Sequence, residues 1–163
     1  MPRQSKYNKG EKDNVKSYQY KAAIYIRLSV EDGDKEESNS ITNQRMLLNQ
    51  FLKDNSDIEV YDYYTDDGFS GTTFNRPGFE KLLEDLYEKK FNTVIVKDLS
   101  RLGRNYIEVG NYIEKVFPLY NIRFIAVNDQ IDSIKNPESV NSIIVPFKNL
   151  INDEYCRDIS NKI

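Results

Sequence analysis

Apolar and polar residues alternate along this chain in two periods, and segments of the two kinds follow one another in turn. Four apolar runs have the length and composition of buried strands, and the run that begins at Phe91 is apolar enough to be central. They cover residues 22–28, 58–66, 91–99 and 122–129. Helix-like segments separate them, so the pattern predicts an α/β fold with a mainly parallel sheet of four to five strands flanked by helices.

Three segments between the strands have the 3.6-residue period of helices that face a core. The first spans residues 40–55, where we expect Met46 to fill core space. The second begins at Pro77, a residue that favours the first position of a helix. The third spans residues 104–120 and is expected to end near Pro118.

The two ends of the chain differ from the middle. Residues 1–20 are polar and net positive, and we interpret them as a flexible arm. Residues 21–136 hold the strand and helix pattern and form one core. From residue 137 apolar side chains keep a helical period to the last residue with no glycine or proline stop signal, so we expect a long helix, cut off at 163, that meets a partner helix or continues into further domains.

Composition excludes several classes of protein. Of 163 residues, 39% are hydrophobic and 30% charged, and no run approaches the ~20 apolar residues of a membrane helix. The single cysteine, Cys156, rules out an internal disulfide framework, and no secretory signal precedes the core, so we expect a cytoplasmic protein. The chain has no histidine, which excludes a Ser-His-Asp triad, and its net charge of −3 argues against wrapping nucleic acid by bulk electrostatics.

An arginine and a serine stand at the end of the first predicted strand. Arg27 and Ser29 are two apart, so their side chains share one face, and Ser29 lies where the strand leaves the sheet. An ordinary explanation is a turn cap at Ser29 and an ion pair from Arg27 to Glu31 or Asp32. The alternative is a reactive serine beside its cation.

Further arginines follow the other predicted strands. Arg101 and Arg104 follow the third strand, and Arg76 lies in the loop after the second. Taken alone, the pair at 101 and 104 is typical of a solvated basic turn. Arginines from several strand ends would nevertheless suit a phosphate or phosphodiester, because guanidinium groups bind its oxygens bidentately. A serine beside them, without histidine, favours attack on phosphorus.

Five segments, in this order, resemble the catalytic domain of the serine site-specific recombinases, the resolvase and invertase superfamily, and specifically the large serine recombinases of integrative and transposable elements. The resemblance runs from about Lys21 to Ile163. The segments are "YIRLS", "SITNQR", "DDGFSGTTFNRPGF", "KDLSRLGRN" and "NDEYCRDISNKI".

The resemblance implies a resolvase-like fold and a role for each matching residue. Ser29 is the nucleophile, and Arg27, Gln44, Arg76, Arg101 and Arg104 complete the catalytic set, with Asp67 and Ser70 in support. It implies cleavage of double-stranded DNA through a 5'-phosphoserine intermediate, strand exchange by a dimer that forms a synaptic tetramer, and integration or excision of a mobile element, in some members with a directionality factor. No metal or cofactor is expected. One departure is Ser100, where small resolvases carry an aspartate, so no acid-base role passes to that position.

Two other functions stay open at this point. The chain could be a catalytically idle module that keeps the fold for oligomerisation through its tail helix, although the serine, the glutamine and the motif arginines are all present. It could also be a phosphate-ester hydrolase that uses the same arginines on small substrates.

Overall fold

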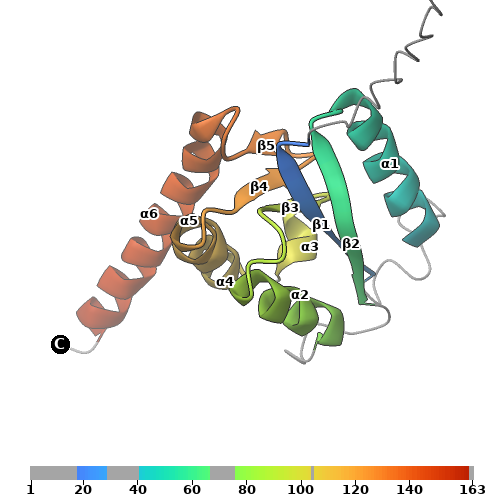
Figure 1. Cartoon of the computed structure of the whole chain (residues 1–163). Helices are drawn as coiled ribbons and strands as arrows, with labels where there is room; N and C mark the ends of the chain where they lie inside the picture. Colours follow the sequence, from blue (N-terminus) through green and yellow to red (C-terminus); the bar gives the residue numbers. More distant parts are fainter. Residues whose placement is uncertain (1–17, 29–40, 67–75, 104, 162–163) are drawn as a thin grey trace, which may run out of the picture.

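A computed structural model of the chain describes residues 18–28, 41–66, 76–103 and 105–161. Five strands form one sheet in the order β2-β1-β3-β4-β5 (Figure 1). The strands are β1 (Tyr20–Arg27), β2 (Ile58–Asp66), β3 (Thr93–Val96), β4 (Arg123–Ala126) and β5 (Ile131–Asp132). The first four run parallel and β5 runs antiparallel to β4, which confirms the predicted α/β class.

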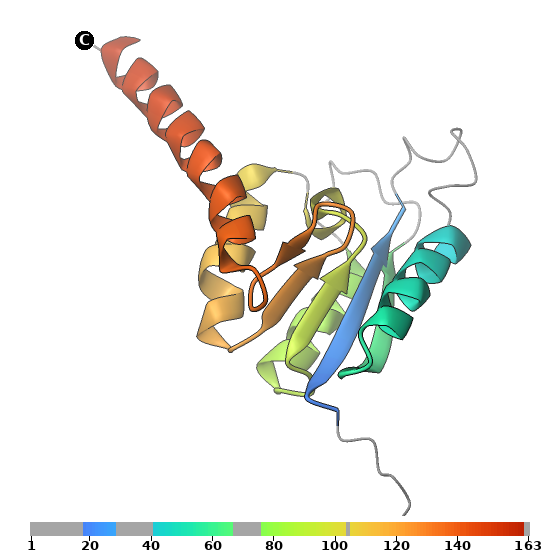
Figure 2. The same ribbon diagram turned by 90° about the horizontal axis from the view of Figure 1, so that it is seen from above.

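The helices lie on both faces of the sheet (Figures 1 and 2). They are α1 (Ile41–Asp54), α2 (Pro77–Tyr87), α3 (Leu99–Leu102), α4 (Tyr106–Asn111), the π-helical turn η3 (Tyr112–Val116), α5 (Phe117–Leu119) and α6 (Pro137–Asn161). The four-residue helix α3 follows β3 directly at the carboxyl edge of the sheet.

Strand β1 divides the core into two halves because successive side chains point to opposite faces. Ala23 and Tyr25 join the cluster that packs under α2, α4 and α5. Ile24 and Ile26 join the second cluster, which contains Leu48 of α1. By the same alternation Arg27 belongs to the face of Tyr25, and it is 5% exposed.

Helix α6 begins against the body of the protein and then extends away from it (Figure 2). Ile144 is buried, and Val140 and Ile143 pack against the larger cluster. Further along, Val145 is exposed and Pro146 lies inside the helix, where it cannot donate a hydrogen bond to the preceding turn. The predicted long terminal helix is therefore present from residue 137 to 161.

Three expectations differ from the structure. Met46 is 64% exposed on the outer side of α1, so the prediction that it fills the core is wrong. The predicted helix 104–120 contains the π-helical turn η3. Its wider turn alters the directions in which the side chains after α4 point, relative to a regular α-helix. The third and fourth strands end three residues earlier than predicted, and the third also begins two residues later, because the flanking residues form turns and α3.

Candidate active site

The carboxyl end of β1 is the centre of the candidate site. Two side chains converge on the carbonyl oxygen of Arg27: Gln44 Nε2 donates to it at 3.3 Å and Arg101 Nη1 at 2.9 Å. Gln44 comes from the first turn of α1 and Arg101 from α3, and both are buried. The backbone that leads directly into Ser29 is therefore held from both faces of the sheet.

The guanidinium of Arg27 reaches in the other direction, onto α3. Its Nε donates to the carbonyl oxygen of Arg101 at 3.3 Å, and its Nη2 donates to the carbonyl oxygen of Ser100. A helix of four residues leaves its last carbonyls without partners in the following turn, so the arginine supplies the missing donors. This contact explains why a buried strand ends in an arginine.

Arg76 approaches α3 from the start of α2. Its Nη1 donates to the carbonyl oxygen of Leu102 at 2.8 Å, and its Nη2 lies 3.0 Å from Glu108 Oε1. The guanidinium also lies over the ring of Phe79, 4.2 Å from the centroid. Consecutive carbonyl oxygens of α3 thus accept hydrogen bonds from Arg27, at the end of β1, and from Arg76, at the start of α2.

Asp66 fixes the start of α2 beside this cluster. This buried carboxylate, the last residue of β2, accepts hydrogen bonds from the backbone N–H groups of Gly78 at 2.7 Å and Phe79 at 3.0 Å. It also accepts one from the hydroxyl of Tyr25 at 2.7 Å. Burial, together with this bond, raises the pKa of Tyr25 well above its usual value, so the phenol stays protonated.

Glycine is required at position 78 because the end of β2 passes very close. A Cβ atom at Gly78 would lie 2.7 Å from the carbonyl oxygen of Thr65 and 3.0 Å from Asp66 Oδ1. The close approach is what lets the Asp66 carboxylate cap α2 in place of Arg76, whose side chain makes no capping bond.

Ser100, the position at which the sequence departs from the resolvase motif, contacts the carboxylate of Asp98. The Ser100 hydroxyl donates to Asp98 Oδ1, and the same carboxylate oxygen lies 3.7 Å from Arg101 Nε. Asp98 is thus an electrostatic partner of Arg101 and is separated from position 100 by one residue. Its contacts are structural, and we assign it no acid-base role.

Four of the predicted site residues lie within the described ranges, and the structure brings them together. Arg27, Gln44, Arg76 and Arg101 are linked through the end of β1 and the carbonyls of α3. The other four predicted residues lie outside the described residues: Ser29, Asp67, Ser70 and Arg104.

Sequence reasoning missed two carboxylates of this cluster. Asp66 is the last residue of a predicted strand and directly precedes Asp67, so the strand end was its only signal. Glu108 is three residues after Asn105, a spacing typical of a helix start. The Asn105 side chain does cap α4, since its Oδ1 accepts from the Glu108 N–H at 2.7 Å.

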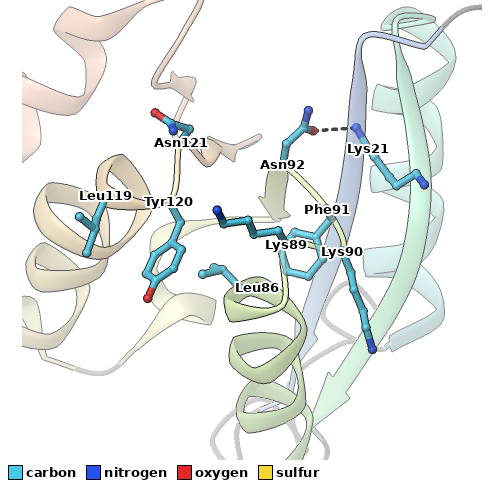
Figure 3. A pocket seen from close by; sticks show the side chains of 9 residues that line it. All are labelled: Lys21, Leu86, Lys89, Lys90, Phe91, Asn92, Leu119, Tyr120 and Asn121. Atoms are coloured by element: carbon cyan, nitrogen blue, oxygen red, sulfur yellow. Dashed lines mark hydrogen bonds between the residues drawn. The ribbon is translucent and has the colours of Figure 1, made fainter.

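A concavity lies at the opposite edge of the sheet from the arginine cluster, near the amino ends of the strands (Figure 3). It has a volume of about 780 Å³ and is lined by Lys21, Leu86, Lys89, Lys90, Phe91, Asn92, Leu119, Tyr120 and Asn121. None of the candidate residues lines it. In parallel α/β sheets sites form at the carboxyl edge, which favours the arginine cluster.

The described segments contain neither a helix long and apolar enough to cross a membrane nor a group of three cysteine, aspartate or glutamate side chains placed to hold a metal ion.

Comparison with known proteins agrees with this geometry. The family described as "Resolvase, N terminal domain" matches residues 22–163. The crystal structure of the N-terminal catalytic domain of TP901-1 integrase is 32% identical, with a TM-score of 0.66, and the match covers 85% of this chain and 98% of that one. The chain therefore belongs to the resolvase family, as a serine recombinase catalytic domain.

Two further solved structures share the fold. A resolvase family site-specific recombinase from Streptococcus pneumoniae is 24% identical with a TM-score of 0.69, over 88% of this chain and 95% of that one. A serine recombinase from Sulfolobus solfataricus is 27% identical with a TM-score of 0.51, over 83% and 88%.

Proposed function

We propose that this chain cleaves and rejoins duplex DNA at recombination sites with Ser29 as the nucleophile. In the cleavage step the Ser29 Oγ–P bond forms and the bond from phosphorus to the 3' oxygen breaks. The hydroxyl proton leaves Ser29, and the departing oxygen takes up a proton to become a 3'-hydroxyl. The product is a 5'-phosphoserine ester, whose reversal rejoins the strand.

The observation that carries this proposal is the convergence of Arg27, Gln44 and Arg101 at the end of β1, two positions before Ser29 in the sequence, with Arg76 on the adjoining carbonyl of α3. Negative charge on the phosphoryl oxygens grows in the five-coordinate transition state. Guanidinium groups that are already positioned in a buried site stabilise that charge without reorganisation. We assign Arg104 to the same clamp, and Asp67 and Ser70 to its support.

We further propose the biological setting. The reaction serves integration or excision of a mobile element, and it needs a dimer on each DNA site and a synaptic tetramer. Of the predicted division into residues 1–20, 21–136 and 137–163, the first acts as an arm up to β1, which already includes Tyr20, the second as the catalytic core, and the third as an oligomerisation helix. The extension of α6 away from the body of the protein supports the assignment of residues 137–163 (Figure 2). A directionality factor is a further partner.

The test is a covalent adduct. The full-length protein is incubated with supercoiled plasmids that carry fragments of its source genome, and protein–DNA adducts are separated under denaturing conditions. We expect an adduct in which mass spectrometry finds the nucleotide on Ser29, and no adduct with Ser29→Ala.

Ser56→Ala, at an exposed serine in the turn after α1, is the matched control and is expected to form the adduct normally. An unchanged adduct with Ser29→Ala would overturn the mechanism. Absence of any adduct, with turnover of small phosphate monoesters, would favour a phosphate-ester hydrolase instead.

A further inference from the structure

The guanidinium of Arg76 lies in a socket made by three helices. Leu102 of α3 accepts from Nη1 at 2.8 Å, Glu108 of α4 binds Nη2 at 3.0 Å, and Phe79 of α2 covers the guanidinium at 4.2 Å. The Arg76 side chain is 11% exposed and that of Glu108 23%. The contacts restrict the guanidinium on two edges and one face.

Glu108 is itself held in place. Its backbone N–H is capped by Asn105 at 2.7 Å, which fixes the first turn of α4. Its carboxylate folds back over Gly103, where a Cβ atom would lie 3.2 Å from Oε2 and 3.1 Å from a methyl of Val109. Glycine at 103 therefore gives the carboxylate room that a Cβ atom would crowd.

We propose that Glu108 is a positioning residue for DNA cleavage, which fixes the guanidinium of Arg76 before DNA binds. The inference rests on the proposed function, because it requires Arg76 to act on the phosphate. Arg76 is the N-cap residue of α2, and its backbone is not helical (φ −122°, ψ 89°). A long side chain at such a position would lose considerable freedom on meeting a phosphate, and the socket removes that cost in advance.

Two substitutions of Glu108 distinguish the effect of its negative charge from the effect of its hydrogen bond to Arg76. Glu108→Gln keeps an oxygen that can accept from Arg76 Nη2, whereas Glu108→Ala removes it. We expect Glu108→Ala to lower the single-turnover cleavage rate about tenfold, with affinity for the DNA changed less than about threefold. Glu108→Gln is expected to restore at least about a third of the rate. Glu80→Ala, at an exposed glutamate of α2, is the matched control.

A double-mutant cycle tests whether Glu108 acts through Arg76. In an Arg76→Ala background, Glu108→Ala should cause no further loss beyond about twofold, because the two changes remove one device. Gly103→Ala, whose Cβ crowds the carboxylate by a few tenths of an ångström, should lower the rate slightly in the unsubstituted protein and have little effect beside Glu108→Ala. Independent losses in both backgrounds, or a full rate with Glu108→Ala, would overturn the proposal.

NMR of the Arg76 guanidinium gives a readout that does not depend on cleavage. We expect slow rotation of its Nη groups in the unsubstituted chain and in Glu108→Gln, and fast averaging in Glu108→Ala. Fast averaging in the unsubstituted chain would refute the positioning role. A protein that forms no adduct would instead refute the proposed function, and the NMR comparison would still decide whether Glu108 fixes Arg76.

Discussion

Arg27 and Arg101 bind each other reciprocally, although they lie 74 positions apart in the sequence. Arg101 Nη1 donates to the Arg27 carbonyl at 2.9 Å, and Arg27 Nε donates to the Arg101 carbonyl at 3.3 Å. Each arginine thus positions the backbone from which the other side chain extends. The pair joins the end of β1 to α3, so the same residues that carry the candidate chemistry also hold its framework together.

The reciprocal contact predicts that removing Arg101 affects both stability and cleavage. Arg101→Ala removes the Nη1 donor from the buried Arg27 carbonyl, and we expect the free energy of unfolding to fall by about 1–3 kcal/mol. Adduct formation should fall by at least about 100-fold, as for the loss of an oxyanion donor. Urea unfolding and the adduct assay measure the two effects.

Arg45→Ala is the matched control, because Arg45 is exposed on α1 and its guanidinium lies over the Tyr63 ring. It should change stability by less than about 0.5 kcal/mol. A loss of adduct with Arg101→Ala at unchanged stability would contradict the framework role.

The hydrogen bonds of Asp66 join the end of β2 to the start of α2, so we expect its substitution to lower stability. Asp66→Asn places an amide where the N–H groups of Gly78 and Phe79 need acceptors, and only one carbonyl oxygen remains to serve them. We expect a loss of about 2 kcal/mol in the free energy of unfolding, measured by urea titration. Asp62→Asn, at an exposed position of the same strand, is expected to be close to neutral; equal losses at the two sites would contradict the capping role of Asp66.

The lowered pKa of Asp85 predicts how the free energy of unfolding depends on pH. The Tyr64 hydroxyl donates to this buried carboxylate at 2.6 Å, and with Lys90 at 3.1 Å and Lys81 at 3.2 Å it lowers the pKa of Asp85 against the opposing effect of burial. A carboxylate with a lowered pKa stabilises the fold above its unfolded pKa of about 3.9, and that stability is lost as pH falls through the folded value.

The measurement is the free energy of unfolding against pH for the unsubstituted chain and Asp85→Asn. The substituted chain should be less stable at pH 7, and the difference should shrink once pH falls below about 4. Other carboxylates with a lowered pKa, such as Asp132, cancel in this comparison because both proteins contain them. A difference independent of pH would show that packing, and not charge, holds Asp85.

The sequence predicted the elements whose hydrophobic period extends over many residues. It did not predict features that depend on a contact between residues distant in the fold. The two-residue strand β5 has too few positions to show a period, and it forms because Asp132 binds Arg123 of β4 through both carboxylate oxygens, at 3.0 and 2.6 Å. Met46 is as apolar as Leu48, which is buried in the same helix, but its side chain points outward.

The candidate site was predictable only in part, for a related reason. The motifs predicted Arg27, Arg76 and Arg101 as site residues, and the structure brings these three side chains together. The partners of Arg27 and Arg76 include backbone carbonyls of α3, and every residue type carries a carbonyl. The orphan carbonyls depend on α3 ending after four residues, a length that no residue pattern indicates.

The turn after α2 gives the last prediction. Lys89 has a left-handed backbone (φ 57°), and it closes the helix with bonds from the Lys89 N–H to Leu86 and from the Lys90 N–H to Asp85, both 3.0 Å. A residue with a Cβ pays a steric cost in this conformation that glycine avoids. Lys89→Gly should therefore raise the free energy of unfolding by about 0.5–1 kcal/mol, measured by thermal and urea unfolding.

Two controls separate the backbone from the side chain. Lys89→Ala keeps the Cβ and should give no gain, which excludes an effect from losing the lysine charge. Asn121, at φ 55°, ends α5 with the same pair of bonds, but asparagine already tolerates this conformation, so Asn121→Gly should gain less than Lys89→Gly. Equal gains from Lys89→Gly and Lys89→Ala would contradict the backbone explanation.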